Sequence, residues 1–122
     1  MRVPKASEAG KELFRSVLPA DPRVEVKPMF GNLGAFVNGN MFAGLFGDGL
    51  FVRVASSDAD ALVEAGGGPF EPMPGRAMTG YTMLPEAWRG DARQAGRWVE
   101  TALTFGRSLP PKAPKPKKAK LS

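Results

Sequence analysis

Three apolar runs separated by two glycine-containing turns occupy the middle of this chain. The runs are residues 33–37, 41–46 and 50–54. Residues 38–40 (Asn-Gly-Asn) join the first two runs, and residues 47–49 (Gly-Asp-Gly) join the second two. Asn-Gly and Asp-Gly pairs accept the positive φ angles that tight hairpin turns require. The pattern therefore predicts an antiparallel β-meander.

A further strand is expected directly before the meander, over residues 24–30. Val24 and Val26 alternate with charged residues there, and Met29 follows them. Pro28 lies inside this run, and because proline has no N–H to donate to a ladder, we expect an edge strand.

Three segments have the pattern of amphipathic helices. The first carries its apolar stripe over residues 13–18 and ends at Pro19. The second is short; Ser57 followed three residues later by Asp60 has the form of a capping box. The last begins near Asp91, a suitable N-cap, and has an apolar stripe over residues 95–103. These segments flank the meander on both sides in the sequence.

The stretch between the second and third helices is rich in proline, glycine and methionine. Residues 70–71 and residues 80–84 could each form a short strand. The whole pattern predicts an α+β fold, in which a mostly antiparallel sheet built on the meander carries the N-terminal, middle and C-terminal helices on one face. We expect one domain over residues 1–108 and a disordered Pro/Lys-rich tail over residues 109–122.

The positive charge of the chain is concentrated in that tail. The formal net charge is +5, from 17 basic and 12 acidic residues. Five of the basic residues are Lys112, Lys115, Lys117, Lys118 and Lys120. Without these five, the remaining basic residues equal the acidic ones in number. The tail could attract nucleic acid or another anionic surface without sequence preference; it could equally be a solubilising terminus.

The absence of two residue types limits the chemistry. The sequence has no histidine and no cysteine, which excludes Ser-His-Asp and Cys-His nucleophile systems and Cys/His zinc sites. We predict no catalytic, cofactor-binding or metal-binding residue. Asp58 and Asp60 could ligate a divalent cation, but acids at a helix N-terminus are the favoured interpretation. No apolar run is long enough to cross a bilayer and no secretory signal is recognised; we therefore expect a cytoplasmic protein.

A row of arginines is the other candidate contact. Arg89, Arg93 and Arg97 are spaced four apart and would form a basic stripe on the last helix. Such a stripe could meet phosphates or an acidic partner, or it could be only a solvated face.

The motif residues of the meander resemble the N-terminal domain of the TfoX/Sxy family. The matching positions are Met29, Phe30, Gly31, Gly34, Gly39, Met41, Phe42, Tyr81 and Pro85, within a resemblance over roughly residues 9 to 107. The resemblance implies an α+β domain standing alone, without the second, helix-rich domain of the regulators that name the family. Those regulators of natural competence act as coactivators beside a transcription factor. The resemblance supplies no catalytic residues, and the matching positions are turn glycines and core apolars.

Three functions follow from these patterns. The leading hypothesis is a non-enzymatic binding or regulatory module that contacts a protein partner and needs no cofactor. The first alternative is a small-molecule binder or an unusual enzyme, with Arg53, Glu71, Arg76 and Tyr81 converging on a pocket. The second is direct nucleic-acid binding through the arginine stripe and the tail. The oligomeric state is left open.

Overall fold

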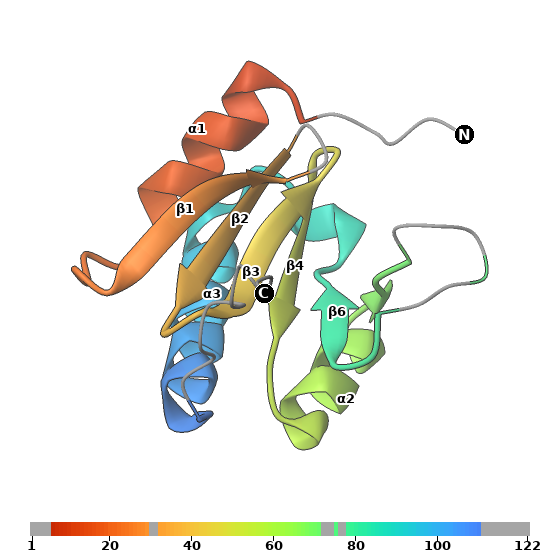
Figure 1. Ribbon diagram of the computed structural model, residues 1–122. Helices are drawn as coiled ribbons and strands as arrows, with labels where there is room; N and C mark the ends of the chain where they lie inside the picture. The colour runs from red at the N-terminus through yellow and green to blue at the C-terminus, as the bar shows by residue number, and fades with distance from the viewer. Residues whose placement is uncertain (1–5, 30–31, 72–74, 76–77, 111–122) are drawn as a thin grey trace.

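The computed structural model describes residues 6–29, 32–71, 75 and 78–110. Figure 1 shows its helices and strands, which confirm the α+β class. In chain order they are α1 (Glu8–Val17), β1 (Val24–Met29), β2 (Asn32–Val37), β3 (Asn40–Phe46), β4 (Gly49–Arg53), α2 (Ser56–Glu64), β5 (Gly68–Pro69), β6 (Tyr81–Met83), the 3-10 turn η1 (Glu86–Trp88) and α3 (Ala92–Ser108).

The strands form one sheet in the order β1-β2-β3-β4-β6-β5, and every neighbouring pair is antiparallel. The predicted meander is confirmed as β2, β3 and β4. Its first turn has Asn38 at φ 52° and Gly39 at φ 81°, the left-handed geometry that an Asn-Gly hairpin turn requires. β1 lies at the edge of the sheet, as Pro28 predicts.

Two details of the sequence-based prediction were wrong. The strand expected at residues 70–71 is instead β5, which ends at Pro69. Phe70 lies outside the ladder, and its carbonyl accepts from the Met78 N–H instead. The second helix begins at Ser56 with Ala55 as its N-cap and without a side-chain capping bond. Ser57 therefore lies inside the first turn rather than at the N-cap, and the predicted capping box does not form.

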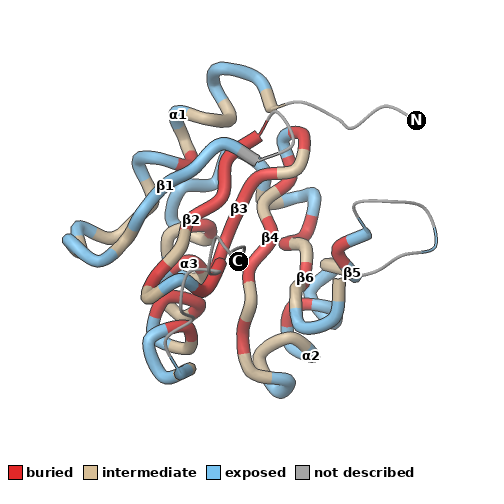
Figure 2. The backbone as a smooth tube through the Cα atoms, in the orientation of Figure 1, coloured by how far each residue is buried: buried red, intermediate tan, exposed pale blue. Residues whose placement is uncertain are grey.

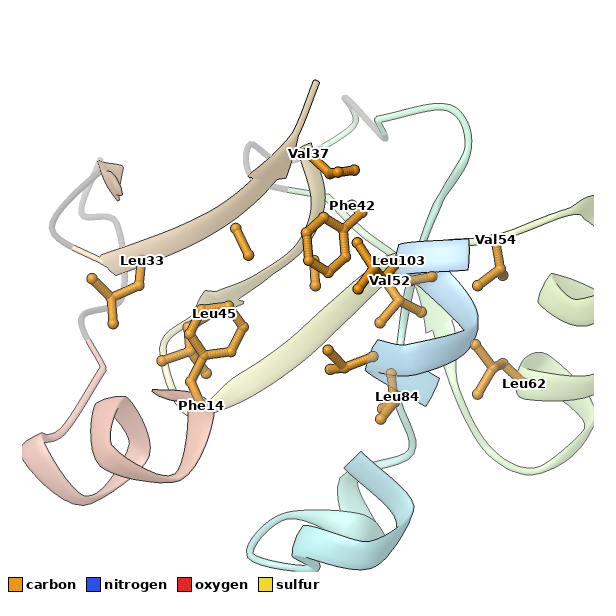
Figure 3. Packing of buried hydrophobic residues seen from close by; sticks show 14 residues of the cluster. Phe14, Leu33, Val37, Phe42, Leu45, Val52, Val54, Leu62, Leu84 and Leu103 are labelled. Atoms are coloured by element: carbon orange, nitrogen blue, oxygen red, sulfur yellow. The ribbon is translucent and has the colours of Figure 1, made fainter. Parts of the chain in front are cut away.

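The helices cover one face of the sheet, as expected. In Figure 1, α1 and α3 lie behind the strands. The main core lies between these two layers and includes Phe14 of α1, Leu62 of α2 and Leu103 of α3 (Figure 3). Figure 2 shows that burial concentrates along the central strands β2, β3 and β4.

A bulge in β3 changes which side chains face the helices. Ala35 pairs with Ala43 but Phe36 pairs with Met41, so Phe42 is an extra residue in β3. Such an insertion disrupts the strict alternation of a strand. Phe42 and Ala43 both join the helix-side core, whereas Met41 belongs to a cluster on the opposite face.

Candidate binding face

The face of the sheet opposite α1 and α3 carries a second apolar cluster, which we call the aromatic face. Three of its side chains are buried and five are half-buried. The buried ones are Met41, Phe51 and Phe70, and the half-buried ones are Phe36, Phe46, Met78, Tyr81 and Met83. The methionine-rich stretch singled out in the sequence thus contributes Met78 and Met83 to this face.

Strand alternation puts these residues on one side. In β4, Leu50 and Val52 pack in the helix-side core, so Phe51 and Arg53 point to the aromatic face. β6 continues the same face because Phe51 pairs with Met83 and Arg53 pairs with Tyr81. The sequence signal was present in this alternation, but the sequence did not show which of these side chains assemble on the face opposite α1 and α3.

The ring packing makes the centre of the aromatic face rigid. Phe51 and Phe70 stack with centroids 4.0 Å apart and an interplanar angle of 10°. Phe46 meets Phe70 edge-on at 5.3 Å. Gly44 leaves the space for this arrangement, since a Cβ there would lie 2.5 Å from the Phe51 ring. Stacked and edge-on pairs of this kind stabilise a cluster beyond its buried area.

Tyr81 is the polar group of this face. Its hydroxyl donates to the Met41 carbonyl at 3.1 Å. Burial raises the pKa of Tyr81 above its ordinary value of 10.0, and the nearby Arg53 charge opposes that rise. The Arg53 guanidinium lies over the Tyr81 ring, 5.7 Å from its centroid. Tyr81 is therefore a fixed hydrogen-bond donor at neutral pH.

A second cation lies at the far side of the same face, on β1. The Lys27 ammonium is 5.0 Å from the centroid of the Phe36 ring and 3.7 Å from the Glu25 carboxylate. Cations over aromatic faces add a modest attraction at exposed positions. Lys27 and Arg53 thus border the apolar area with positive charge.

The arginine stripe expected on the last helix is not continuous. Arg89 lies before α3, at the end of η1, where it forms a 3.6 Å ion pair with Glu86. Arg93 and Arg97 lie on α3, both exposed, and line a shallow hollow against the end of α1. The prediction of three arginines on one helix was therefore wrong for Arg89, because α3 starts only at Ala92.

The five tail lysines, together with Phe30 and Gly31, lie outside the described residues. The last described residue is Pro110, whose carbonyl accepts a hydrogen bond from the Asn40 amide at 3.1 Å. This bond fixes the start of the tail beside the β2–β3 turn.

The remaining motif residues are distributed over the described fold. Gly39 forms the first hairpin turn, and Met41 and Tyr81 lie on the aromatic face. Phe42 packs in the helix-side core. Gly34 and Pro85 are buried, and Met29 ends β1.

The pocket that would support a small-molecule binder is not assembled from the expected residues. Arg53 contacts Tyr81, but Glu71 is exposed and Arg76 lies outside the described part of the chain. Among the described residues, the shallow hollows found at the ends of α1 and along α3 are not lined by Arg53, Glu71 or Tyr81. Within the described ranges, Asp58 and Asp60 belong to no cluster of three or more potential metal ligands.

Fold and site together define a small α+β domain with helices on one face of an antiparallel sheet and an aromatic cluster on the other. The family model of the TfoX N-terminal domain matches residues 12–106. The chain therefore belongs to the TfoX N-terminal domain family. No curated protein matches it. Of the helices described, none has the length and apolar character needed to cross a membrane.

Proposed function

We propose that this chain is a non-enzymatic, cytoplasmic binding module that contacts a protein partner through the aromatic face. The proposal rests on one observation: the described helices cover only one face of the sheet. Phe36, Phe46 and Tyr81 remain half-buried on the face that no described helix covers. Side chains of this type are the ones that gain most from burial against a second surface.

The composition of the face suits a protein partner. Aromatic residues, methionine and arginine are enriched at the centres of protein interfaces. Here a rigid Phe51–Phe70 stack lies beneath unbranched methionine side chains, Met78 and Met83, which can adapt to a partner's shape. The bordering cations favour an apolar segment of a partner that also carries acidic groups.

The non-catalytic part of the proposal draws on two carboxylates that are held by structural hydrogen bonds. The carboxylates of Asp21 and Asp48 accept hydrogen bonds from their neighbours, which hold their pKa values below the ordinary range. Groups poised for acid–base catalysis have pKa values near neutrality instead. Reproducible turnover of a defined metabolite by the purified chain, abolished by a single substitution, would refute this part of the proposal.

The regulatory setting comes from the family resemblance. The TfoX/Sxy regulators act as coactivators beside a transcription factor, and this chain belongs to the family of their N-terminal domain. We therefore propose that the partner is a regulatory protein rather than a structural one.

Photo-crosslinking at a single position tests the proposed face. A benzophenone amino acid replaces Phe36 in the full chain, and in a matched control it replaces Val63 of α2. Val63 is a suitable control because it is a large hydrophobic residue with 52% of its surface exposed. We expect a discrete heterologous adduct from position 36 that is absent from position 63.

The identified partner is then titrated against purified variants. Phe36→Gln should weaken its binding by at least about tenfold, the loss expected for an interface aromatic, while the thermal unfolding midpoint stays within a few degrees. Val63→Gln should leave the affinity unchanged. Equal adducts from both positions, or affinity insensitive to Phe36, would remove the aromatic face as the contact.

Nucleic-acid binding is the second candidate, and the Asn40–Pro110 bond favours it. That bond holds Pro110, which precedes the lysine-rich segment in the sequence, beside the β2–β3 turn. We expect salt-dependent binding of DNA or RNA by the full chain and its loss in a chain ending at Leu109. Affinity that changes with neither salt nor truncation would eliminate this candidate.

A further inference from the structure

The outer edge of β1 is unpaired among the described residues. β1 is the first strand of the sheet and pairs only with β2. The hydrogen bonds of β1 show which of its main-chain groups face away from β2. Pro28 has no N–H, and the Val24 N–H donates to the Asp21 carbonyl at 2.9 Å rather than to β2. Along a strand, the N–H and C=O groups of alternate residues point to the same side. Val24, Val26 and Pro28 are such alternate residues, so the Val26 N–H and C=O point away from the sheet.

The side chains of this edge are divided between the two faces. Val26 pairs with Ala35, whose side chain belongs to the helix-side core, so Val26 lies on the helix side. It is nevertheless 40% exposed, one of two large hydrophobic side chains that stand exposed in the described chain. Glu25 and Lys27 point to the other side, where Lys27 reaches Phe36.

The order of charges along β1 is self-complementary. If two copies of β1 pair antiparallel about a two-fold axis at Val26, Glu25 of each copy lies directly opposite Lys27 of the other. An axis at Glu25 would place two carboxylates opposite each other, and an axis at Lys27 would place two ammonium groups opposite each other. Like charges directly opposite are destabilising and opposite charges are stabilising. Of these three registers, the charges therefore favour the one centred on Val26, and the Val24 N–H, already bonded to Asp21, is not free to centre another.

We propose that two copies of this chain associate through the free edges of their β1 strands, antiparallel and centred on Val26. The two Val26 residues exchange a pair of main-chain hydrogen bonds, and their exposed side chains cover each other. Two Glu25–Lys27 pairs flank this centre on the opposite side. The result is a continuous sheet of two domains, which is the isologous form of a two-fold interface.

The same geometry makes this a weak dimer. Pro28 cannot donate, and the Val24 N–H already has an intramolecular acceptor. The contact is therefore short and falls in the low range of interface size, where association is transient. Proline and charged residues at a sheet edge also limit its extension by further strands. Association should stop at the dimer.

Sedimentation velocity of the full chain between about 10 and 1,000 μM tests the proposal, a range suited to weak association. Wild-type protein should pass from monomer to dimer with concentration. Glu25→Lys and Lys27→Glu should each weaken the dimer by about tenfold or more, because each creates two like-charge pairs. Val26→Glu should also weaken it, whereas Val63→Glu on α2 should not.

Mixing the two charge variants gives the decisive result. A Glu25→Lys chain and a Lys27→Glu chain carry complementary charges in the proposed register, so an equimolar mixture should form heterodimers although each alone is monomeric. The double variant E25K/K27E should recover homodimerisation. Misfolding cannot produce either recovery.

Three outcomes would overturn the proposal. One is a wild-type chain that stays monomeric at the highest concentration. Another is a dimer that is unaffected by Val26→Glu, which would place the contact elsewhere. The third is a pair of charge variants that fail to recover association when mixed, which would show that β1 receives a different strand or none.

Discussion

The Arg107 guanidinium lies 2.9 Å from the Asp21 carboxylate, across 86 residues of sequence. The same carboxylate accepts from the Arg23 backbone N–H at 2.9 Å and from its guanidinium at 3.2 Å. Asp21 therefore joins the last turn of α3 to the loop that leads into β1. Its side chain is only 11% exposed, although it lies at the surface.

This arrangement predicts an acid-dependent loss of stability. The hydrogen bonds from Arg23, aided by Arg107, lower the pKa of Asp21 from 3.8 to about 2. Because the folded-state value is depressed, the stabilisation is present above pH 3.8 and is lost as the pH falls towards 2. Asp21→Asn should lower the urea midpoint at pH 6, and the difference from wild type should vanish near pH 2. A difference that persists unchanged at pH 2 would contradict this assignment.

A second effect on stability is expected from Ser7, which caps the start of α1. Its hydroxyl accepts from the Gly10 N–H at 3.0 Å and donates to the Asp48 carboxylate at 2.9 Å. Ser7→Ala should reduce the free energy of unfolding by about 1 kcal/mol, as for other lost N-caps. Ser16→Ala is the control in the same helix, since Ser16 Oγ only donates to the Leu13 carbonyl. Urea unfolding of both variants at pH 7 should show a loss for Ser7→Ala alone.

Alanine substitutions at two glycines of α3 should change the stability of the fold in opposite directions. A Cβ at Gly106 would lie 2.9 Å from Val37 Cγ1, whereas one at Gly96 would meet only Val17, at 3.9 Å. Gly106→Ala should destabilise the fold by about 1–3 kcal/mol through overpacking. Gly96→Ala should stabilise it by about 0.5–1 kcal/mol through helix propensity. Chemical denaturation of the two variants measures this contrast, and equal effects would show that α3 does not press on the sheet at Gly106.

The ionisation of the Tyr81 phenol can be followed without interference from another tyrosine. It is the single tyrosine of the chain, so the ultraviolet signal of tyrosinate reports one site. The midpoint should lie above 10.0 because burial raises the pKa, and the stabilisation this represents is lost as the pH rises through the folded-state value. Arg53→Gln should move the midpoint higher, because the arginine charge lowers it. Lys27→Gln, at the other border of the face, should leave it unchanged.

The fold followed from local signals because those signals agree with one another. The turn at Asn38 and Gly39 needs positive φ angles, and few residues other than asparagine and glycine supply them. The Asp91 cap is equally local: its carboxylate accepts from the Gln94 N–H at 3.2 Å. Such features depend on neighbours in sequence and are visible without the tertiary structure.

The aromatic face and the arginine positions depended on contacts between distant residues. Phe70 looked like a strand residue, but its carbonyl accepts from the Met78 N–H and its ring stacks on Phe51. Arg89 matched a four-residue spacing, yet it ends the 3-10 turn at residues 86–88, and α3 starts only at Ala92. The bulge at Phe42 likewise has no local signature, since it adjusts one strand to another. The sequence supplied the residues of the candidate site but not their assembly.

Two asparagines hold the described ends of the chain at opposite ends of β2. Asn32 Oδ1 accepts from the Ala6 N–H at 2.7 Å, and the Asn40 amide donates to the Pro110 carbonyl beyond the other end of the strand. A covalent bridge from Pro110 to Ala6 must therefore run the length of a six-residue strand, about 20 Å. A circularly permuted chain needs a linker of at least about six extended residues. Reporter proteins joined at Ala6 and at Pro110 would therefore start from opposite ends of β2.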